Sequence, residues 1–331
     1  MEETLRRSGR GKVRRPFARK SAAQARGSSK PLLRAIVDFG ADSSFEKAAR
    51  KLREHYGLEV PAGPVARECL RVARTLEQTP RMARTLAPDG PETIVAEADG
   101  TMIPLMETPR QAQGDRRKQR SVLWKEMRLF AAQAQGSART HYAAGMDNAE
   151  QAGARWTQTV RAAGWAQHTH IHGVGDGAEW ISTQFEQHFA RHGKYLLDMY
   201  HACEYLGECA PEGQEASAWL EKTKEALRQN HAAEIIEELG RRQEAPNKAE
   251  EDAPIRRAHR YLDTRRGQLD YQAAIERGLP IGSGLIESGH RHVLQARLKI
   301  PGAWWRADNA HAMAQLRVCR ANGLWSQLWR N

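Results

Sequence analysis

The sequence has few cysteines and no long apolar segment. Four cysteines occur among its 331 residues, and no two of them are spaced as a CxxC pair. A zinc ribbon or a disulfide framework is therefore not indicated, and the chain suits a reducing compartment. No apolar run approaches the roughly 18 residues that a membrane span needs, and the N-terminus lacks the apolar core of a signal peptide. We therefore expect a soluble protein with no membrane partner.

Basic side chains outnumber acidic ones, 51 to 40, and they concentrate near the two ends of the sequence. Residues 1–30 contain ten basic and two acidic side chains, and residues 287–331 contain seven and two. Clustered positive charge favours a polyanion partner, because neutralising phosphates releases their condensed counterions. The low apolar content of residues 1–30 predicts a disordered basic arm, with a merely solubilising tail as the alternative.

Residues 31–90 are predicted to form a helical region. Ser43 and Glu46 suggest a capping box at the start of one helix, and Gly57 is placed where that helix should stop. A second helix is expected to bury Val65, Cys69, Val72 and Leu76, while another of its faces carries Arg67, Arg71 and Arg74. Two short helices with a basic stripe resemble a DNA-binding helix-turn-helix, and a solvated helical hairpin is the alternative.

Residues 91–206 change to the pattern of an α/β sheet. Strands are predicted within residues 92–105, 124–135, 138–146, 168–176 and 193–200, with helices over 147–163 and 178–188. Three neighbouring strands followed by two helix-connected strands indicate a sheet of mixed direction, flanked by helices. Residues 207–280 are charged and show no strand pattern, which predicts an all-α insertion. Residues 281–331 are expected to complete the core with its last helices.

Three carboxylates stand at the ends of these predicted elements. Asp99 and Asp176 each follow an apolar strand and precede a glycine, and Glu287 lies in the first turn of a helix opened by GSG. Convergent carboxylates suit Mg²⁺, and two such ions can drive an in-line phosphoryl displacement. Glycines beside the aspartates would leave room for a DNA backbone. Tight turns and helix capping are the alternative roles for the same residues.

Several motifs in order resemble one known family. The series EADGT, GDGAEWI, LDMYHACEYL and GSGLIESGHRHVLQARLK, followed by a Trp-rich end, is similar to the RNase H-like DDE transposases of bacterial insertion sequences, most closely the ISKra type. The resemblance covers roughly residues 40 to 331. It implies an RNase H-like core with a helical insertion and a catalytic, metal-binding triad of Asp99, Asp176 and Glu287. Asp198 and His201 match a DxxH signature found beside the active site in several transposase groups.

The resemblance also implies a reaction and its partners. It predicts DNA strand cleavage and strand transfer with two Mg²⁺ ions, for which Mn²⁺ can substitute. Double-stranded DNA would be the partner of a homo-oligomer in the bacterial cytoplasm, associated with the nucleoid. The N-terminal part is shorter than that family would lead us to expect. Phosphate contacts are predicted for Arg291, Arg297 and Lys299, with solvated basic side chains as the alternative.

Other functions compete with this one. HTHIH places His168, His170 and His172 on one strand face, as a zinc metallohydrolase would require. Against this, the helical stretch 207–280 offers no further ligands at strand ends. A non-catalytic DNA-binding regulator would need only the helix pair and the basic ends. The tryptophans near the C-terminus have two alternative roles, stacking on bases or packing in the core. They are Trp304, Trp305, Trp325 and Trp329.

Overall fold

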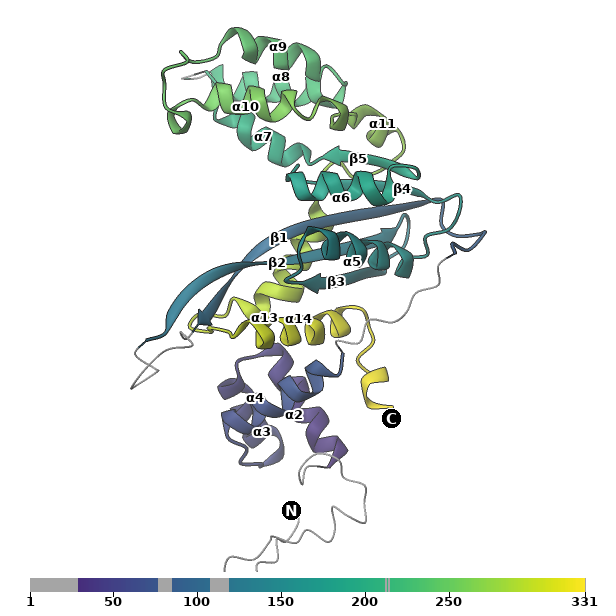
Figure 1. Ribbon diagram of the computed structural model, residues 1–331, viewed down its shortest axis with the longest axis vertical. Helices are drawn as coiled ribbons and strands as arrows, with labels where there is room; N and C mark the ends of the chain where they lie inside the picture. Colours follow the sequence, from purple (N-terminus) through teal and green to yellow (C-terminus); the bar gives the residue numbers. More distant parts are fainter. Residues whose placement is uncertain (1–28, 77–84, 108–118, 212, 214, 331) are drawn as a thin grey trace, which may run out of the picture. The chain divides into compact units, whose positions relative to one another are not determined.

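A computed structural model describes residues 29–76, 85–107, 119–211, 213 and 215–330. The predicted basic arm therefore lies almost wholly outside the described residues. Within them the protein is a mixed α/β structure with one five-stranded sheet and flanking helices (Figure 1). The described chain contains no helix that is both long and apolar enough to cross a membrane. The described residues divide between two compact units, one within residues 1–80, 103–125 and 292–331 and the other within residues 81–102 and 126–291.

The sheet has the strand order β3-β2-β1-β4-β5. Its strands are β1 Thr93–Glu107, β2 Ser121–Ala134, β3 Thr140–Gly145, β4 His170–Gly175 and β5 Gly193–Leu197. β4 runs parallel to β1 on one side and to β5 on the other, whereas β2 and β3 are antiparallel. The predicted mixed sheet flanked by helices is confirmed.

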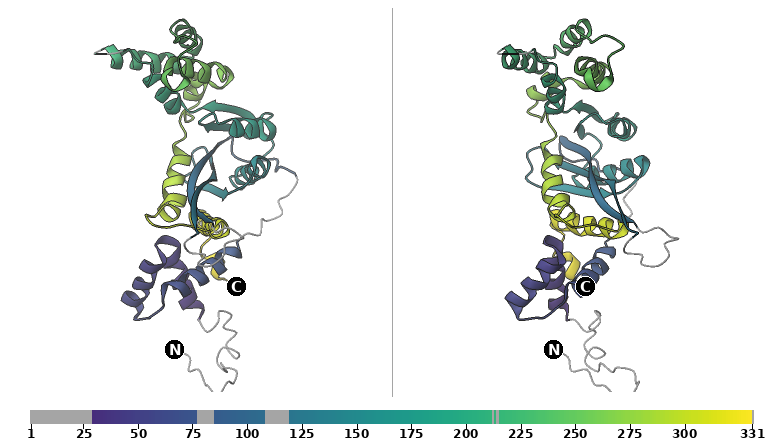
Figure 2. Two further views of the ribbon diagram at one scale, coloured as in Figure 1. Left: turned by 60° about the vertical axis from the view of Figure 1, so that its left-hand side comes forward. Right: turned by 90° about the vertical axis from the view of Figure 1, so that its left-hand side faces the viewer.

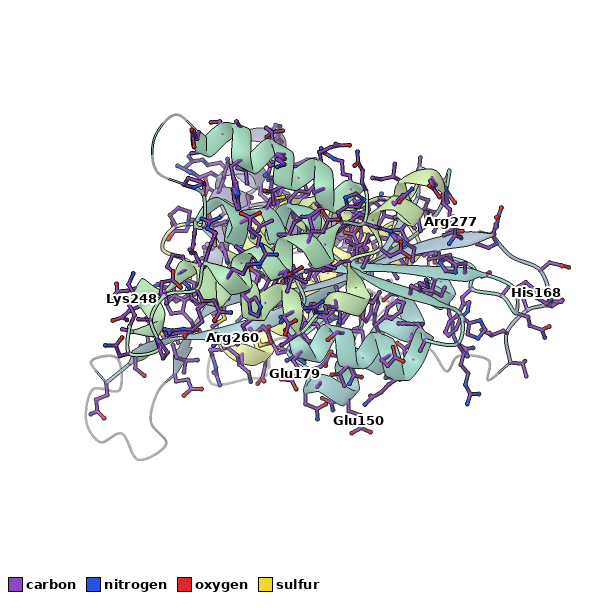
Figure 3. All side chains as sticks on the ribbon, turned by 90° about the horizontal axis from the view of Figure 1, so that it is seen from above. Glu150, His168, Glu179, Lys248, Arg260 and Arg277 are labelled. Carbon is purple, nitrogen blue, oxygen red and sulfur yellow. The ribbon has the colours of Figure 1, made fainter. Side chains whose placement is uncertain are left out.

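One face of the sheet is covered by α5 (Ala149–Ala162) and α6 (Glu179–Phe189). Apolar side chains at alternate positions of β1 pack there with aromatic residues of both helices, including Ile94, Ala96, Ala98, Trp156 and Phe185. Because strand side chains alternate between faces, the intervening residues of β1 must point to the opposite face. The outer sides of the two helices are polar, as the exposed Glu150 and Glu179 illustrate (Figure 3).

Helices fill the chain between β5 and the last segment of the core. They are α7 (Met199–Gly207), α8 (Glu215–Arg228), α9 (Ala232–Arg241), α10 (Pro254–Asp263) and α11 (Tyr271–Glu276), and Figure 2 shows them grouped together in both views. Leu206, Leu227, Ile236, Leu239 and Leu262 belong to the buried cluster that they enclose. After them, α12 (Gly284–Gly289) continues into a π-helical turn (His290–Gln295) and α13 (Ala296–Leu298).

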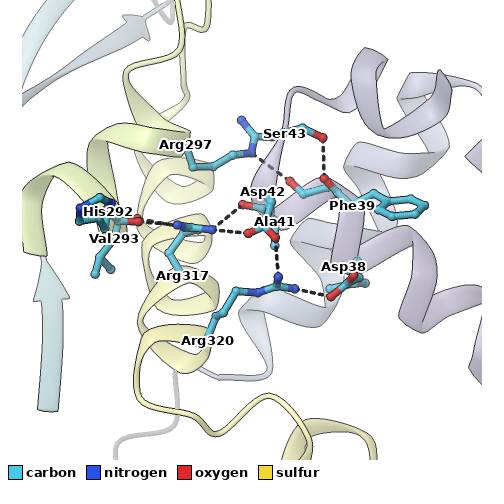
Figure 4. A network of polar contacts seen from close by, with 12 residues as sticks. Asp38, Phe39, Ala41, Asp42, Ser43, His292, Val293, Arg297, Arg317 and Arg320 are labelled. Carbon is cyan, nitrogen blue, oxygen red and sulfur yellow. Dashed lines mark hydrogen bonds and ion pairs between the residues drawn. The ribbon is translucent and has the colours of Figure 1, made fainter. Parts of the chain in front are cut away.

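The other unit contains a bundle of three N-terminal helices with α13 and α14 (Ala307–Ala321). α2 (Lys30–Asp42) is an addition to the two helices that the sequence predicts, which appear as α3 (Phe45–Tyr56) and α4 (Ala62–Arg74). Ile36, Leu52 and Val65 form the bundle core. Arg317 and Arg320 of α14 pair with Asp42, and Arg320 also pairs with Asp38 (Figure 4).

The two ends of α3 test the predicted helix signals. Gly57 ends the helix with φ of 64°, as predicted, because a left-handed residue is most easily supplied by glycine. The predicted cap at Ser43 is wrong. Ser44 is the N-cap and accepts a hydrogen bond from the Lys47 amide at 3.2 Å, while the Ser43 hydroxyl donates to the Phe39 carbonyl at 2.7 Å and closes α2.

Candidate active site

Asp99 and Asp176 stand at the same level on neighbouring parallel strands. In the β1–β4 register Thr93 pairs with His170 and Glu97 with Val174, an offset of 170 − 93 = 77 residues. The same offset separates Asp99 from Asp176, so continuing the register sets them side by side where β4 ends. Adjacent strands are only about 4.8 Å apart, which explains how residues so distant in sequence become neighbours.

Asp198 extends this row to a third strand. β4 and β5 pair Gly175 with Leu197, and the next residues along are Asp176 and Asp198. Three aspartates therefore follow one another across β1, β4 and β5. Asp176 and Asp198 follow the ends of their strands, whereas Asp99 lies midway along β1, so the prediction that Asp99 follows a strand is wrong. Sequence spacing alone could not show this arrangement, because the order of strands in the sheet determines which ends are neighbours.

Asp176 has one carboxylate oxygen occupied within the protein. Its Oδ1 accepts a hydrogen bond from the Ala178 amide at 2.8 Å, and its backbone carbonyl accepts one from the Tyr261 hydroxyl at 2.6 Å. Burial raises the pKa of Asp176, and the neighbouring negative charge of Asp99 raises it further, whereas His201 and Arg265 act in the opposite direction. The two aspartates thus repel each other, and a divalent cation bound to both would relieve that repulsion.

The glycines beside Asp176 serve the protein's own packing. A Cβ on Gly177 would lie 2.5 Å from Nε of Arg265, which also donates to the Gly177 carbonyl at 3.0 Å. A Cβ on Gly175 would lie 2.7 Å from the Tyr195 hydroxyl. The expectation that these glycines leave open space for a DNA backbone is therefore wrong, because protein side chains fill that space. The φ of Gly177 is 77°, a left-handed conformation that glycine adopts without strain.

Asp99 pairs with a histidine that the sequence did not single out. Its Oδ1 accepts a hydrogen bond from the Gly100 amide at 2.6 Å, and its Oδ2 lies 3.1 Å from Nε2 of His290. The His290 contact has the distance of an ion pair, but its angles fall short of a hydrogen bond, and Nδ1 of the same ring is buried without a partner. His290 is only 5% exposed and opens the π-helical turn.

Glu97 was also missed by sequence reasoning, although it lies two residues before Asp99 on the same strand face. Its Oε2 accepts a hydrogen bond from the Ile286 amide in α12 at 2.7 Å, and the side chain is 1% exposed. Burial raises the pKa of Glu97 to about 8, and the charges of Asp198 and Glu287 raise it as well. The sequence signal for Glu97 is its position two residues before Asp99 in EADG, because side chains two apart in a strand share a face.

Glu287 lies in α12 directly after the residue that Glu97 contacts, and its side chain is exposed. Across the described ranges, no three or more His, Cys, Asp or Glu side chains form a group that could hold a metal ion. The structure therefore brings Asp99 and Asp176 together but does not join Glu287 to them as a third ligand. The two aspartates are oxygen donors of the kind that Mg²⁺ prefers.

Asp198 and His201 both lie at the start of α7. Asp198 is its N-cap, and its Oδ1 accepts from the amides of Tyr200 at 2.7 Å and His201 at 3.2 Å. Its Oδ2 accepts from the Ser283 amide at 2.8 Å and from the Ser283 hydroxyl. The His201 ring makes edge-to-face contacts with Tyr205 and Tyr261, and its Nδ1 lies 3.1 Å from Oε2 of Glu204. Asp198 thus connects α7 to the start of α12.

The predicted DNA-contacting residues differ in their availability. Arg67, Arg71 and Arg74 are all exposed, but Nε of Arg71 pairs with Glu68 at 2.8 Å and Nη2 of Arg74 donates to Asn309 at 2.7 Å. Arg291 is exposed and Lys299 is half-buried.

Arg297 is not accessible for the predicted phosphate contact, because it is 1% exposed. Its Nε donates to the Gly40 carbonyl at 2.9 Å, and its guanidinium lies over the rings of Phe45 and Trp305 (Figure 4 shows its polar contact). Trp305 is likewise a core residue, and its indole donates to the Leu298 carbonyl at 3.1 Å, while Trp304 is 59% exposed. Trp325 and Trp329 contact each other edge to face.

The three histidines of HTHIH do not gather. His168 is exposed before β4 begins (Figure 3), His170 contacts Arg277, and Nε2 of the buried His172 lies 2.8 Å from the Pro280 carbonyl. They therefore form no zinc site among the residues that the structure describes. The four cysteines are all free.

Fold and site together define a mixed α/β protein with a row of three aspartates across the neighbouring parallel strands β1, β4 and β5. The chain belongs to a family described as an uncharacterised protein family (UPF0236), whose model matches residues 21–330. No curated protein matches the chain. The family description names no activity, so the site itself has to indicate the function.

Proposed function

We propose that this protein is a DNA transposase, which cuts strands at the ends of an insertion sequence and joins them to target DNA. The alignment of Asp99 and Asp176 on β1 and β4 carries this proposal. Both residues lie in the motifs that resemble the RNase H-like transposases. The order of elements is also that of the predicted core, with three neighbouring strands, two helix-connected strands, and helices inserted before the segment that carries Glu287.

The donor set suits a divalent cation in part. Asp99 and Asp176 would hold Mg²⁺ or Mn²⁺, because burial and, to a lesser extent, the charge of Asp99 raise the pKa of Asp176, and a bound cation would offset both effects. In this proposal Glu287 is the third ligand, and it would join the two aspartates when DNA is bound. Two bound ions would supply the activation of the attacking hydroxyl and the stabilisation of the leaving oxygen.

The protein's own residues would orient the reacting groups. The Ala178 amide fixes the Asp176 carboxylate through Oδ1, and its Oδ2 would then be the oxygen that binds the cation. Exposed basic side chains such as Arg67 and Arg291 would bind phosphates, with double-stranded DNA as the partner. We further propose that the protein acts as a homo-oligomer on DNA, in the nucleoid of the bacterial cytoplasm.

A strand-cleavage assay tests the proposal. The substrate is labelled duplex DNA carrying the ends of the element that encodes the protein, incubated with Mg²⁺, with Mn²⁺ or with EDTA. We expect cleavage with either metal and none with EDTA. Asp99→Asn and Asp176→Asn should bind the same DNA without cutting it. Wild-type protein that binds the ends but cuts under no metal condition would overturn the enzymatic function.

A non-catalytic DNA-binding regulator is the second candidate. The observation that favours it is the absence, within the described chain, of a ready three-ligand metal group. This function would need only the α3–α4 helix pair and exposed basic residues. End-specific DNA binding that is identical in wild type and Asp176→Asn, without cleavage by either, is its expected result.

A further inference from the structure

Two acidic side chains of β1 face α12 at successive turns. Glu97 and Asp99 are two residues apart, so they project from the same face of the strand. Glu97 contacts the Ile286 amide and Asp99 contacts the His290 ring, and these two partners are one helical turn apart. The opposite face of β1 carries Ile94, Ala96 and Ala98 and is packed against α5 and α6. β1 thus separates an apolar layer from a polar contact with α12.

α12 approaches the sheet closely because of a glycine. A Cβ on Gly289 would lie 2.7 Å from Cε1 of Tyr142 and 2.9 Å from Cδ2 of Leu129. Any larger residue would push the helix away from β2 and β3. The position of α12 against the sheet is therefore set by packing at Gly289 and by polar contacts at its start.

The start of α12 is held by two carboxylates from different strands. Asp198, after β5, accepts from the amide and hydroxyl of Ser283, and Glu97 of β1 accepts from the Ile286 amide. Amides in the first turn of a helix have no partner within the helix, so these carboxylates satisfy groups that would otherwise be unpaired. Burying a carboxylate at 1% exposure is costly unless such bonds compensate. The contact with Ile286 compensates part of that cost for Glu97.

We propose that Glu97 is a positioning residue, which fixes the first turn of α12 against β1 so that His290 is held beside Asp99. This role rests on the proposed strand-cleavage function. Glu97 acts through the backbone of α12 and needs only an oxygen acceptor at its side-chain end. Asp99 and Asp176, by contrast, need their negative charge to hold a cation.

The charge and the acceptor can be separated by two substitutions. Glu97→Gln keeps a carbonyl oxygen that can accept from the Ile286 amide, whereas Glu97→Leu has a similar size but no acceptor. Asp99→Asn, two residues along the same strand face, is the matched control for loss of charge. At saturating DNA we expect Glu97→Gln to cleave within about 3-fold of wild type, and Glu97→Leu about 10 to 100-fold more slowly, as for other residues that orient metal ligands. The affinity for DNA should stay within about 2-fold in both, because no phosphate contact is lost.

Hydrogen exchange gives a readout that does not depend on catalysis. In Glu97→Leu the amides of residues 284–289 should exchange faster than in wild type, while residues 179–189 of α6 should be unchanged. Glu97→Gln should restore slow exchange. If wild type never cuts DNA, the proposed function fails while the exchange data still report on the contact between Glu97 and α12.

Two results would overturn the positioning role. A folded Glu97→Gln protein that loses cleavage as completely as Asp99→Asn would show that the charge of Glu97 acts directly. Cleavage by Glu97→Leu at the wild-type rate would show that the contact with Ile286 is not needed. Should Glu97→Leu fail to fold, the comparison of Glu97→Gln with Asp99→Asn still decides the question.

Discussion

Asp99 and His290 meet with Oδ2 and Nε2 3.1 Å apart, and the histidine ring is almost completely buried. The other oxygen of Asp99 accepts from the Gly100 amide, so both oxygens already have a neighbour in the protein. A cation at Asp99 must therefore share an oxygen with one of these groups. His290 is placed to orient the carboxylate in the way that outer partners orient metal ligands.

Replacing His290 should slow cleavage more than it weakens DNA binding. His290→Phe keeps a ring of similar size but removes the nitrogen that faces Asp99. We expect a loss of about 10 to 100-fold in cleavage rate with unchanged affinity, the range found when a partner of a metal ligand is removed. Single-turnover cleavage and a gel-based binding titration measure the two quantities. An unaltered cleavage rate would show that the contact with Asp99 is only structural.

Asp176→Asn should abolish cleavage and leave DNA binding intact. The substitution removes a negative charge beside Asp99 but no basic side chain, and Asn can still accept from the Ala178 amide. The chain offers a matched control in Asp89, which also precedes a glycine but is exposed and lies outside the strands. Asp89→Asn should cut at the wild-type rate. Cleavage by Asp176→Asn at that same rate would reduce Asp176 to a turn residue.

Much of the sheet could be predicted from sequence because apolar alternation is a local signal. Asp99 and Asp176 became candidates because each precedes a glycine beside apolar strand residues, although only Asp176 follows the end of its strand. Glu97 and His290 could not be found in this way, since both are buried polar groups whose partners come from distant segments. Burial of a charged side chain depends on tertiary contacts, which a local pattern does not contain.

Arginines illustrate the same limit. Arg67 and Arg297 look alike in sequence, yet one is exposed and the other is 1% exposed between aromatic rings. The N-cap of α3 also depends on contacts that the local sequence pattern does not contain. Ser43 and Ser44 are equivalent by composition, and the choice between them depends on α2, whose last turn uses the Ser43 hydroxyl.

Arg67 should contribute more to recognition of DNA ends than its two neighbours on the α4 stripe. All three side chains are exposed, but Arg71 and Arg74 already have the protein partners Glu68 and Asn309. If α4 enters the major groove, Arg67→Gln should reduce discrimination by about 1 to 3 kcal/mol, the contribution of one bidentate base contact. Competition binding between end-bearing and random duplexes measures this difference.

Deletion of residues 1–30 provides the contrasting case for α4. This segment carries ten basic side chains, so its loss should weaken binding to every sequence and flatten the salt dependence. An Arg67→Gln variant with undiminished preference for the ends would remove α4 from the recognition surface. If the deletion leaves the salt dependence of DNA affinity unchanged, residues 1–30 do not contribute phosphate contacts.

Arg297→Ala should destabilise its unit rather than weaken phosphate binding. The change leaves the Gly40 carbonyl without its donor and opens a cavity between Phe45 and Trp305. We expect a loss of roughly 2 to 4 kcal/mol in the free energy of unfolding, as for other large buried side chains. Lys299→Ala, at a half-buried position nearby, should cost within about 0.5 kcal/mol. Urea unfolding measures both, and a stable Arg297→Ala protein with weakened DNA binding would reverse this assignment.

The histidines of β4 should make stability fall as the pH is lowered from about 6.5. Burial lowers the pKa of His170 to about 4, helped by the positive charge of Arg277, and burial also lowers the pKa of His172. In the unfolded chain both rings take up protons near pH 6.5, whereas the folded protein resists protonation. The unfolded state therefore binds more protons below pH 6.5, and stability present above that pH is progressively lost down to about pH 4.

His170→Gln should lose less stability than wild type between pH 7.5 and 5.5, and the exposed His168→Gln should lose as much as wild type. Urea midpoints at these two pH values isolate the contribution of His170, because the titrating carboxylates are common to all three proteins. Equal losses in wild type and His170→Gln would contradict the prediction.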